Sequence, residues 1–148
     1  MIKRLILLSV FICFCLSVSA QIETPAKWSY GAKKINNVEA VIFLKATIED
    51  GWHVYSAYQK PGGPTKTSFA FSSSPDFDLL GKVNEPKPIT VFDKVFEINV
   101  SYFEKSVVFQ QKIKLKADQT VVKGKLSYMV CSNQKCIPDE INFSIPVN

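Results

Sequence analysis

The sequence is short of the residues on which most enzymes rely. It contains one histidine and four cysteines among 148 residues, and two of these cysteines lie in an apolar N-terminal segment. A Cys/His nucleophile would need His53 beside a thiol together with a third orienting group, and no local pattern indicates one. Carboxylates and hydroxyls form no recognisable catalytic constellation either. Ordinary hydrolytic catalysis is therefore not expected.

A strong net charge and a second long apolar run are also missing. Residues 1–20 hold two of the 18 basic residues and none of the 13 acidic ones, so the rest of the chain carries a net charge of +3. So weak and scattered an excess gives no reason to expect a nucleic-acid partner. No apolar run after residue 20 approaches the roughly 20 residues that span a bilayer, so we expect no stable membrane insertion of that part.

The N-terminus has the parts of a secretory signal peptide. Two basic residues precede an apolar run from Leu5 to Leu16, and Val18-Ser19-Ala20 supplies the small residues of a cleavage site. The apolar run is shorter than a membrane anchor requires. We therefore predict that residues 1–20 are a signal peptide and that residues 21–148 form one exported domain, periplasmic in a Gram-negative source.

Alternation of apolar and polar residues predicts strands throughout the exported part. No helical period is sustained. In Ser106–Lys116 the odd positions Val107, Phe109, Ile113 and Leu115 are apolar, and the even positions Gln110, Lys112, Lys114 and Lys116 are polar. The other predicted strands are Glu39–Asp50, Trp52–Tyr55, Lys66–Phe71, Phe77–Val83, Glu97–Tyr102, Val121–Val130 and Ile141–Val147. Turn residues separate these short strands, a pattern typical of an antiparallel β-sandwich.

The stretch Pro86–Asp93 is the least regular of the exported part. Two prolines limit ladder pairing there, while Ile89, Val91 and Phe92 remain apolar. We expect an irregular loop whose apolar side chains cover another part of the molecule.

The exported part keeps one pair of cysteines, Cys131 and Cys136. An even number of cysteines in an exported protein indicates a disulfide, and these two stand at the mouth of a predicted hairpin. Closing so short a loop yields only about 2 kcal/mol, against about 4.7 kcal/mol for a loop of about 100 residues. A short loop also lets the bond break and reform while the sandwich stays folded. On chemistry alone, redox exchange and a structural staple stay equally open.

A copper site is a third interpretation of the same residues. Cys131, Cys136, Met129 and His53 are soft ligands of the kind that cuprous ions prefer. Zinc would need a further close nitrogen or sulfur ligand, and none is evident. A lone histidine between aromatic residues of a strand is more often a half-buried sheet residue, so neither a metal nor another cofactor is expected.

Three segments together resemble the N-terminal periplasmic domain of the DsbD thiol:disulfide interchange proteins. They are Ile48–Ser56, the turn Pro61–Thr65, and the C-terminal pattern Tyr128…Cys131…Cys136-Ile137-Pro138. The resemblance implies an immunoglobulin-like β-sandwich that takes electrons from a thioredoxin-like protein or domain and passes them to oxidised periplasmic proteins. It favours redox exchange over a staple, and the chain would then be a component of a protein-disulfide reductase.

The resemblance also implies different roles for the two cysteines. Cys136 would form the mixed disulfide with the partner, and Cys131 would resolve it. The sequence agrees, because Cys131 ends an apolar strand whereas Cys136 follows the polar run Ser132–Lys135. We therefore expect Cys131 to lie closer to the core and Cys136 closer to solvent.

The resemblance further implies a cap over the disulfide and an active-site strand beside it. The cap matches the segment Ile89–Asp93, with Phe92 as the covering aromatic residue beside Asp93, and Phe96 as the second choice. The active-site strand matches the positions of His53 and Tyr55.

Three departures from the family pattern are visible. Family proteins continue into a multi-helix membrane domain and a thioredoxin-like domain, whereas this chain stops at Asn148, so we expect its reductant to act in trans. Four residues separate the cysteines, one fewer than in the best-known members, and Asp139 replaces a second proline. The alternative function is a non-catalytic binding module with a structural disulfide.

Overall fold

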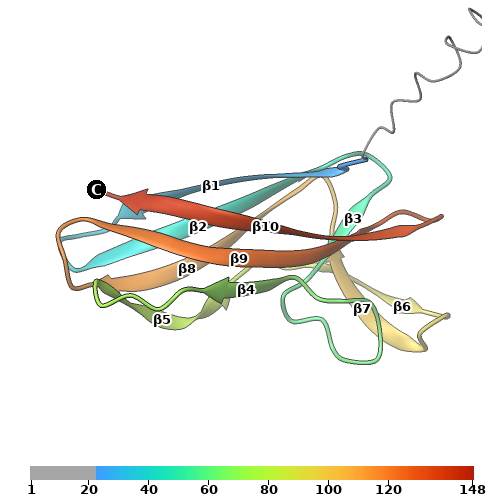
Figure 1. The fold of residues 1–148 in the computed structure, drawn as a ribbon. Helices are drawn as coiled ribbons and strands as arrows, with labels where there is room; N and C mark the ends of the chain where they lie inside the picture. Colours follow the sequence, from blue (N-terminus) through green and yellow to red (C-terminus); the bar gives the residue numbers. More distant parts are fainter. Residues whose placement is uncertain (1–22) are drawn as a thin grey trace, which may run out of the picture.

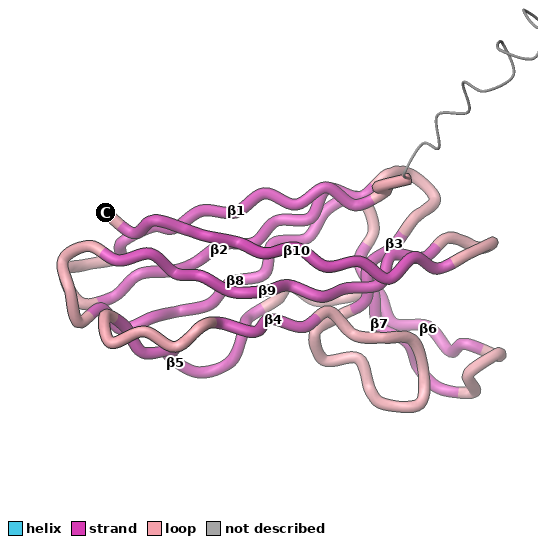
Figure 2. The backbone as a smooth tube through the Cα atoms, in the orientation of Figure 1, coloured by secondary structure: helices cyan, strands magenta, loops and turns pink. Residues whose placement is uncertain are grey.

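Two antiparallel β-sheets pack face to face in the computed structural model, which describes residues 23–148 (Figures 1 and 2). The predicted signal peptide, residues 1–20, lies outside the described residues. The four-stranded sheet has the order β1 (Ala26–Lys34), β2 (Glu39–Ile48), β8 (Ser106–Leu115) and β5 (Phe77–Asn84). The six-stranded sheet has the order β10 (Cys136–Val147), β9 (Thr120–Cys131), β3 (His53–Tyr55), β7 (Ile98–Phe103) and β6 (Ile89–Asp93), and β4 (Ser68–Phe71) also pairs with β9. The predicted all-β sandwich is confirmed.

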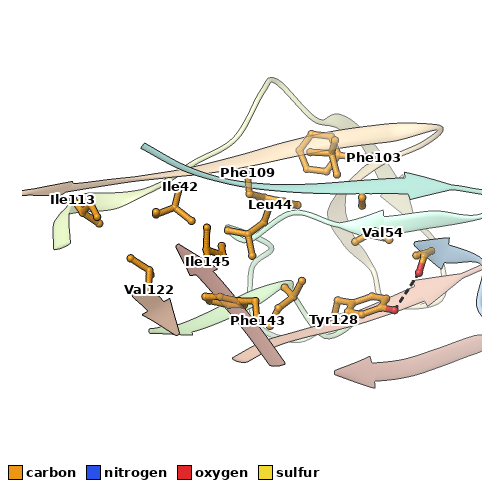
Figure 3. Close-up of a cluster of buried hydrophobic side chains, with 14 of the residues drawn as sticks. Ile42, Leu44, Val54, Phe103, Phe109, Ile113, Val122, Tyr128, Phe143 and Ile145 are labelled. Atoms are coloured by element: carbon orange, nitrogen blue, oxygen red, sulfur yellow. Dashed lines mark hydrogen bonds between the residues drawn. The ribbon is translucent and has the colours of Figure 1, made fainter. Parts of the chain in front are cut away.

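The core lies between the two sheets and follows from the alternation of the strands. In β8 the apolar positions of the predicted inner face, among them Phe109 and Ile113, are fully buried. Figure 3 shows Leu44 and Phe109 of one sheet together with Phe143 and Tyr128 of the other, all within one cluster. Within residues 23–148, no helix has the length and apolarity that crossing a membrane requires.

The structure corrects the sequence prediction at three strands. Pro86–Asp93 is not entirely a loop, because Ile89–Asp93 forms the edge strand β6, which pairs on one side only and starts after both prolines. Ala26–Lys34 forms β1, another edge strand, which was missed because it buries few side chains. The last strand begins at Cys136 rather than Ile141, and the remaining strand ends lie within two residues of their predicted positions.

Two hairpins project from the same end of the sandwich (Figures 1 and 2). One is the β9–β10 hairpin, in which Cys131 and Cys136 are the last and first strand residues. The other is the β6–β7 hairpin, which carries the predicted cap residues. The short strand β3 lies between β9 and β7, so the predicted site residues come from one end of one sheet.

Candidate disulfide site

Cys131 and Cys136 are direct partners in the β9–β10 ladder and form a disulfide, with the two Cα atoms 4.1 Å apart. The turn between them is closed by its own polar groups. The Ser132 backbone N–H donates to the Lys135 carbonyl at 2.8 Å, and the Ser132 hydroxyl accepts from the N–H groups of Gln134 and Lys135 at 3.2 and 3.3 Å. The turn thereby holds the cysteines opposite each other at the end of the ladder.

The two sulfur-bearing residues differ in their access to solvent. Cys131 is 1% exposed, whereas Cys136 is exposed, so the expected difference in burial is confirmed. Cys131 points to the outer face of the six-stranded sheet, away from the main core. It is buried there in a second apolar cluster, which we call the outer-face cluster: Tyr55, Val100 and Cys131, flanked by Ile98, Tyr102 and Met129.

His53 and Tyr55 lie beside the buried cysteine. Through the pairing of β3 with β9, His53 is directly opposite Cys131, and through the pairing of β3 with β7, Tyr55 is opposite Tyr102. His53 Nε2 lies 3.0 Å from the Tyr55 hydroxyl, and its ring centroid lies 4.7 Å from that of Tyr102. The structure therefore brings both predicted residues of the active-site strand next to the disulfide.

The loop after β3 is hydrogen-bonded to the strands that carry the outer-face cluster. The buried Thr67 hydroxyl donates to the Tyr55 carbonyl at 2.5 Å. Gln59 Oε1 accepts from the Ser101 backbone N–H at 2.7 Å, which ties the loop to β7. Gly63, in the turn that contributed to the family resemblance, approaches Ile98 so closely that an added Cβ would lie 2.7 Å from its Cδ1 atom. The Pro61–Thr65 turn is thus a support for the site.

Burial controls the electrostatics of this face. Desolvation lowers the pKa of His53, and the charge of Glu104 opposes that shift. Desolvation raises the pKa of Tyr55, and the charges of Asp93 and Tyr102 add to the increase. Both effects favour the uncharged form of each side chain near neutral pH. Burial therefore favours the neutral imidazole of His53 and the neutral phenol of Tyr55 on this face of the sheet.

The β6–β7 hairpin presents its predicted cap residues in different directions. Phe92 pairs with Asn99 and is 62% exposed, and the alternation of β6 places it on the opposite face of the sheet from Cys131. Asp93 lies on the disulfide face, and its carboxylate accepts from the N–H groups of Val95 and Phe96 at 2.7 and 3.1 Å, which closes the turn. Phe96 is exposed in this turn.

Lys135 and Asp139 lie near the cysteines in the β9–β10 hairpin, and each has partners outside the outer-face cluster. Lys135 forms an ion pair with Glu23, and its Nζ atom lies 5.8 Å from the centroid of the Trp52 ring. Asp139, at the place of the family's second proline, accepts a 2.9 Å hydrogen bond from the Tyr128 hydroxyl on the core face. Burial and this hydrogen bond raise the pKa of Tyr128. Asp139, which replaces the proline of the family pattern, therefore provides a hydrogen-bond acceptor for the Tyr128 hydroxyl.

Sequence reasoning missed three members of the outer-face cluster, Ile98, Val100 and Tyr102. All three lie on the predicted strand Glu97–Tyr102, but only the register between β7 and β3 brings that strand to Tyr55. Met129 packs against the cluster that contains Cys131, and His53 pairs with Cys131 in the ladder, but the two cysteine sulfurs are bonded to each other. The described residues contain no group of three or more His, Cys, Asp or Glu side chains placed to hold a metal ion.

Comparisons with known proteins show the same fold in solved structures. A solved chain of the N-terminal periplasmic domain of ScsB from Proteus mirabilis is 21% identical, with a TM-score of 0.62 over 86% of this chain and 48% of that one. This chain therefore spans about half of the ScsB chain. The reduced DsbD N-terminal domain of Neisseria meningitidis is 19% identical, with a TM-score of 0.58 over 84% of this chain and 86% of that one.

A third solved structure is the complex between the DsbD N-terminal and the PilB N-terminal domains from Neisseria meningitidis. It is 12% identical, with a TM-score of 0.51 over 88% of this chain and 91% of that one. No curated protein sequence matches the chain significantly. The model of the family "Thiol:disulfide interchange protein DsbD, N-terminal" matches residues 22–147. The chain belongs to this family of DsbD N-terminal domains.

Proposed function

We propose that the Cys131–Cys136 pair relays reducing equivalents from a thioredoxin-like protein or domain to oxidised exported proteins. The observation that carries this proposal is the unequal burial of the two bonded cysteines at the end of one hairpin. Thiol–disulfide exchange requires in-line attack on one sulfur, so a pair with one accessible sulfur gives a defined order of steps. Membership of the DsbD N-terminal family supports the same chemistry.

The proposed cycle moves two electrons through the disulfide. A thiolate of the reduced partner attacks Cys136 Sγ, the Cys131–Cys136 bond breaks, and the electron pair stays on Cys131, which takes up a proton. The partner's second thiolate then attacks the mixed disulfide, closes the partner's own disulfide and leaves Cys136 reduced. The same steps in reverse order, with an oxidised exported protein as acceptor, regenerate the Cys131–Cys136 bond.

The face of the six-stranded sheet that carries the disulfide supports a protein partner, and its apolar surface extends to β6, at the opposite edge of the sheet from Cys136. Val91 and Ile89 of β6 are exposed apolar side chains, and the register of β6 and β7 places them on the disulfide face. The DsbD N-terminal domain of Neisseria meningitidis forms a complex with the PilB N-terminal domain, which supports docking of a protein domain on this fold. We propose a thioredoxin-like domain as the partner of this chain.

A cap role for the β6–β7 hairpin also belongs to the proposal. Phe96 is exposed in the turn of this hairpin and would cover the sulfur atoms once the hairpin bends over the outer-face cluster. Phe92 is exposed on the opposite face, so it would cover them only if the hairpin also twists and turns that face toward the disulfide. Such a movement would bury apolar surface that is open to solvent in the present arrangement. The cap would then shield the disulfide between encounters with partners.

Export to the periplasm is the cellular setting that we propose. Residues 1–20 would be removed as a signal peptide, and residues 21–148 would be the working domain. The related ScsB domain is a periplasmic one, which supports this location. Expression with the leader in a Gram-negative host should give periplasmic protein beginning at Gln21 by mass spectrometry, whereas membrane-bound protein with an intact Met1 would contradict the proposal.

Direct electron transfer tests the proposed function. The oxidised domain is mixed with a reduced thioredoxin-like domain, the reaction is stopped with acid, and free thiols are alkylated and counted by mass spectrometry. We expect Cys131 and Cys136 to gain thiols as the partner loses them, and the double variant Cys131→Ala/Cys136→Ala to leave the partner reduced. A wild-type disulfide that stays intact would instead favour a binding module with a structural disulfide.

A further inference from the structure

In the proposed cycle the buried Cys131 thiol must lose and regain a proton, and the cycle names no group that exchanges this proton with it. Cys131 is 1% exposed, so water has little access to it. Burial in apolar surroundings disfavours a thiolate. Cys131 must nevertheless be a thiolate when it attacks Cys136 Sγ, and it is released as a thiolate when the Cys131–Cys136 bond breaks. A side chain next to Cys131 that accepts and returns a proton would remove this obstacle.

His53 is placed to do so. It lies directly opposite Cys131 in the β3–β9 ladder, where facing Cβ atoms are about 4.5–5.5 Å apart. Its ring is held on this face by the Tyr55 hydroxyl, 3.0 Å from Nε2, and by the ring of Tyr102. It is the only histidine of the chain and therefore its only imidazole base.

We infer that His53 accepts the proton of the Cys131 thiol when that thiol resolves the mixed disulfide at Cys136, and returns it in the reverse direction. This inference rests on the proposed function. The Cys131–Cys136 bond forms, the bond between Cys136 and the partner breaks, the electron pair leaves with the partner's sulfur, and the proton moves to the imidazole. In the tautomer that serves this role, Nε2–H donates to the Tyr55 hydroxyl and Nδ1 accepts the proton. Tyr55 is then a positioning residue.

The surroundings of His53 suit a base that works at neutral pH. Burial lowers its pKa, so the imidazole is neutral there, while Glu104 at the end of β7 limits the shift. Tyr55 of its own strand and Tyr102 of β7 contact the ring. Asp93 of β6 acts on Tyr55, and Lys135 of the β9–β10 turn is paired with Glu23. A neutral imidazole on the residue that faces a buried thiol across a strand pair can act as a general base.

A two-phase reaction with 5,5′-dithiobis(2-nitrobenzoate) isolates the step. Attack by Cys136 of the reduced domain releases one nitrothiobenzoate, and resolution by Cys131 releases the second in a phase independent of reagent concentration. In the wild type the second-phase rate should rise with pH and level off above the pKa of His53, measured separately by NMR on this single histidine. In His53→Gln it should be at least about tenfold slower at pH 7 and keep rising toward the thiol pKa.

Rescue separates proton transfer from a structural role. Free imidazole in the buffer should accelerate the second phase of His53→Ala and leave that of the wild type unchanged. An equal first-phase rate in all three proteins shows that Cys136 and its surroundings are intact. If the second phase of His53→Gln keeps the wild-type pH profile, or imidazole does not rescue His53→Ala, the inference is wrong while the proposed function stands. If the wild type shows no first phase, the proposed function itself is wrong.

Discussion

Cys131 and Cys136 face each other across the last pair of the β9–β10 ladder, yet only Cys136 reaches solvent. Tyr55 and Val100 cover Cys131 on the outer face of the sheet. A disulfide between unequal sulfurs reacts in a preferred order, because an attacking thiolate must approach along the S–S axis. The asymmetry therefore gives each cysteine a separate role in the proposed exchange.

The first prediction concerns these roles. Cys131→Ala leaves Cys136 without its resolving thiol, so incubation with an oxidised thioredoxin-like partner should accumulate a mixed disulfide through Cys136. Cys136→Ala should trap little, because the remaining thiol is buried. Non-reducing electrophoresis with mass spectrometry of the linked peptides measures both. Equal trapping by the two variants would show that the role assignment is wrong.

The second prediction concerns the cap. Phe92→Ala should speed reduction of the Cys131–Cys136 disulfide by a small thiol such as dithiothreitol, because the proposed twisted cap would lose the ring that it turns toward the sulfur atoms. Tyr30→Ala is the matched control, since Tyr30 is also an exposed aromatic residue but lies on β1 of the other sheet. If Phe92→Ala reduces at the wild-type rate and Phe96→Ala reduces faster, Phe96 is the cap residue. If neither changes the rate, the hairpin is not a cap.

The third prediction concerns the folded state after reduction. The disulfide links residues only five positions apart, so its loss should cost about 2 kcal/mol. A domain of this size typically has about 5–15 kcal/mol of stability, so the reduced sandwich should still unfold cooperatively, at a lower temperature. Calorimetry with and without a reductant measures the difference. Loss of the cooperative transition on reduction would favour the structural staple.

The strands were predictable because alternation is a local property, whereas the site depends on pairing between distant segments. The apolar residues of the inner face of β8 could be predicted, whereas the burial of Gln111 among them could not. The position of His53 opposite Cys131 could not be predicted, since it depends on β3 pairing with β9, and the sequence contains no signal for that register. Family likeness located the segment of Phe92 and Asp93, but only the β6–β7 register showed that Asp93 is on the disulfide face.

Edge strands were the other weak point of the sequence prediction. β1 buries few side chains, and Gly31 and its lysines blur the alternation. β6 exposes most of its apolar residues, so its pattern resembled that of a loop. Both strands form backbone hydrogen bonds with one neighbouring strand only, and such pairing requires no particular pattern of apolar side chains.

The fourth prediction concerns Gly124, which stands where β4, β9 and β10 meet. A Cβ added there would lie 2.4 Å from Phe143 Cζ and 2.6 Å from the Ala70 carbonyl oxygen. Gly124→Ala should therefore lower the free energy of unfolding by about 1–3 kcal/mol through overpacking. Gly31→Ala is the matched control in β1, because an added Cβ there meets nothing within 4 Å. Denaturant unfolding compares the two, and equal stabilities would contradict the packing described for the β9–β10 pair.

The reduction potential of the Cys131–Cys136 pair tests the central claim most directly. The domain is equilibrated in dithiothreitol buffers of known ratio, quenched with acid, alkylated and analysed by mass spectrometry. Structural disulfides of exported proteins lie below about −300 mV, whereas exchange proteins lie above that value, nearer the thioredoxin-like carriers. A relay predicts a potential above about −300 mV, and a potential clearly below it would show that the bond is a structural staple.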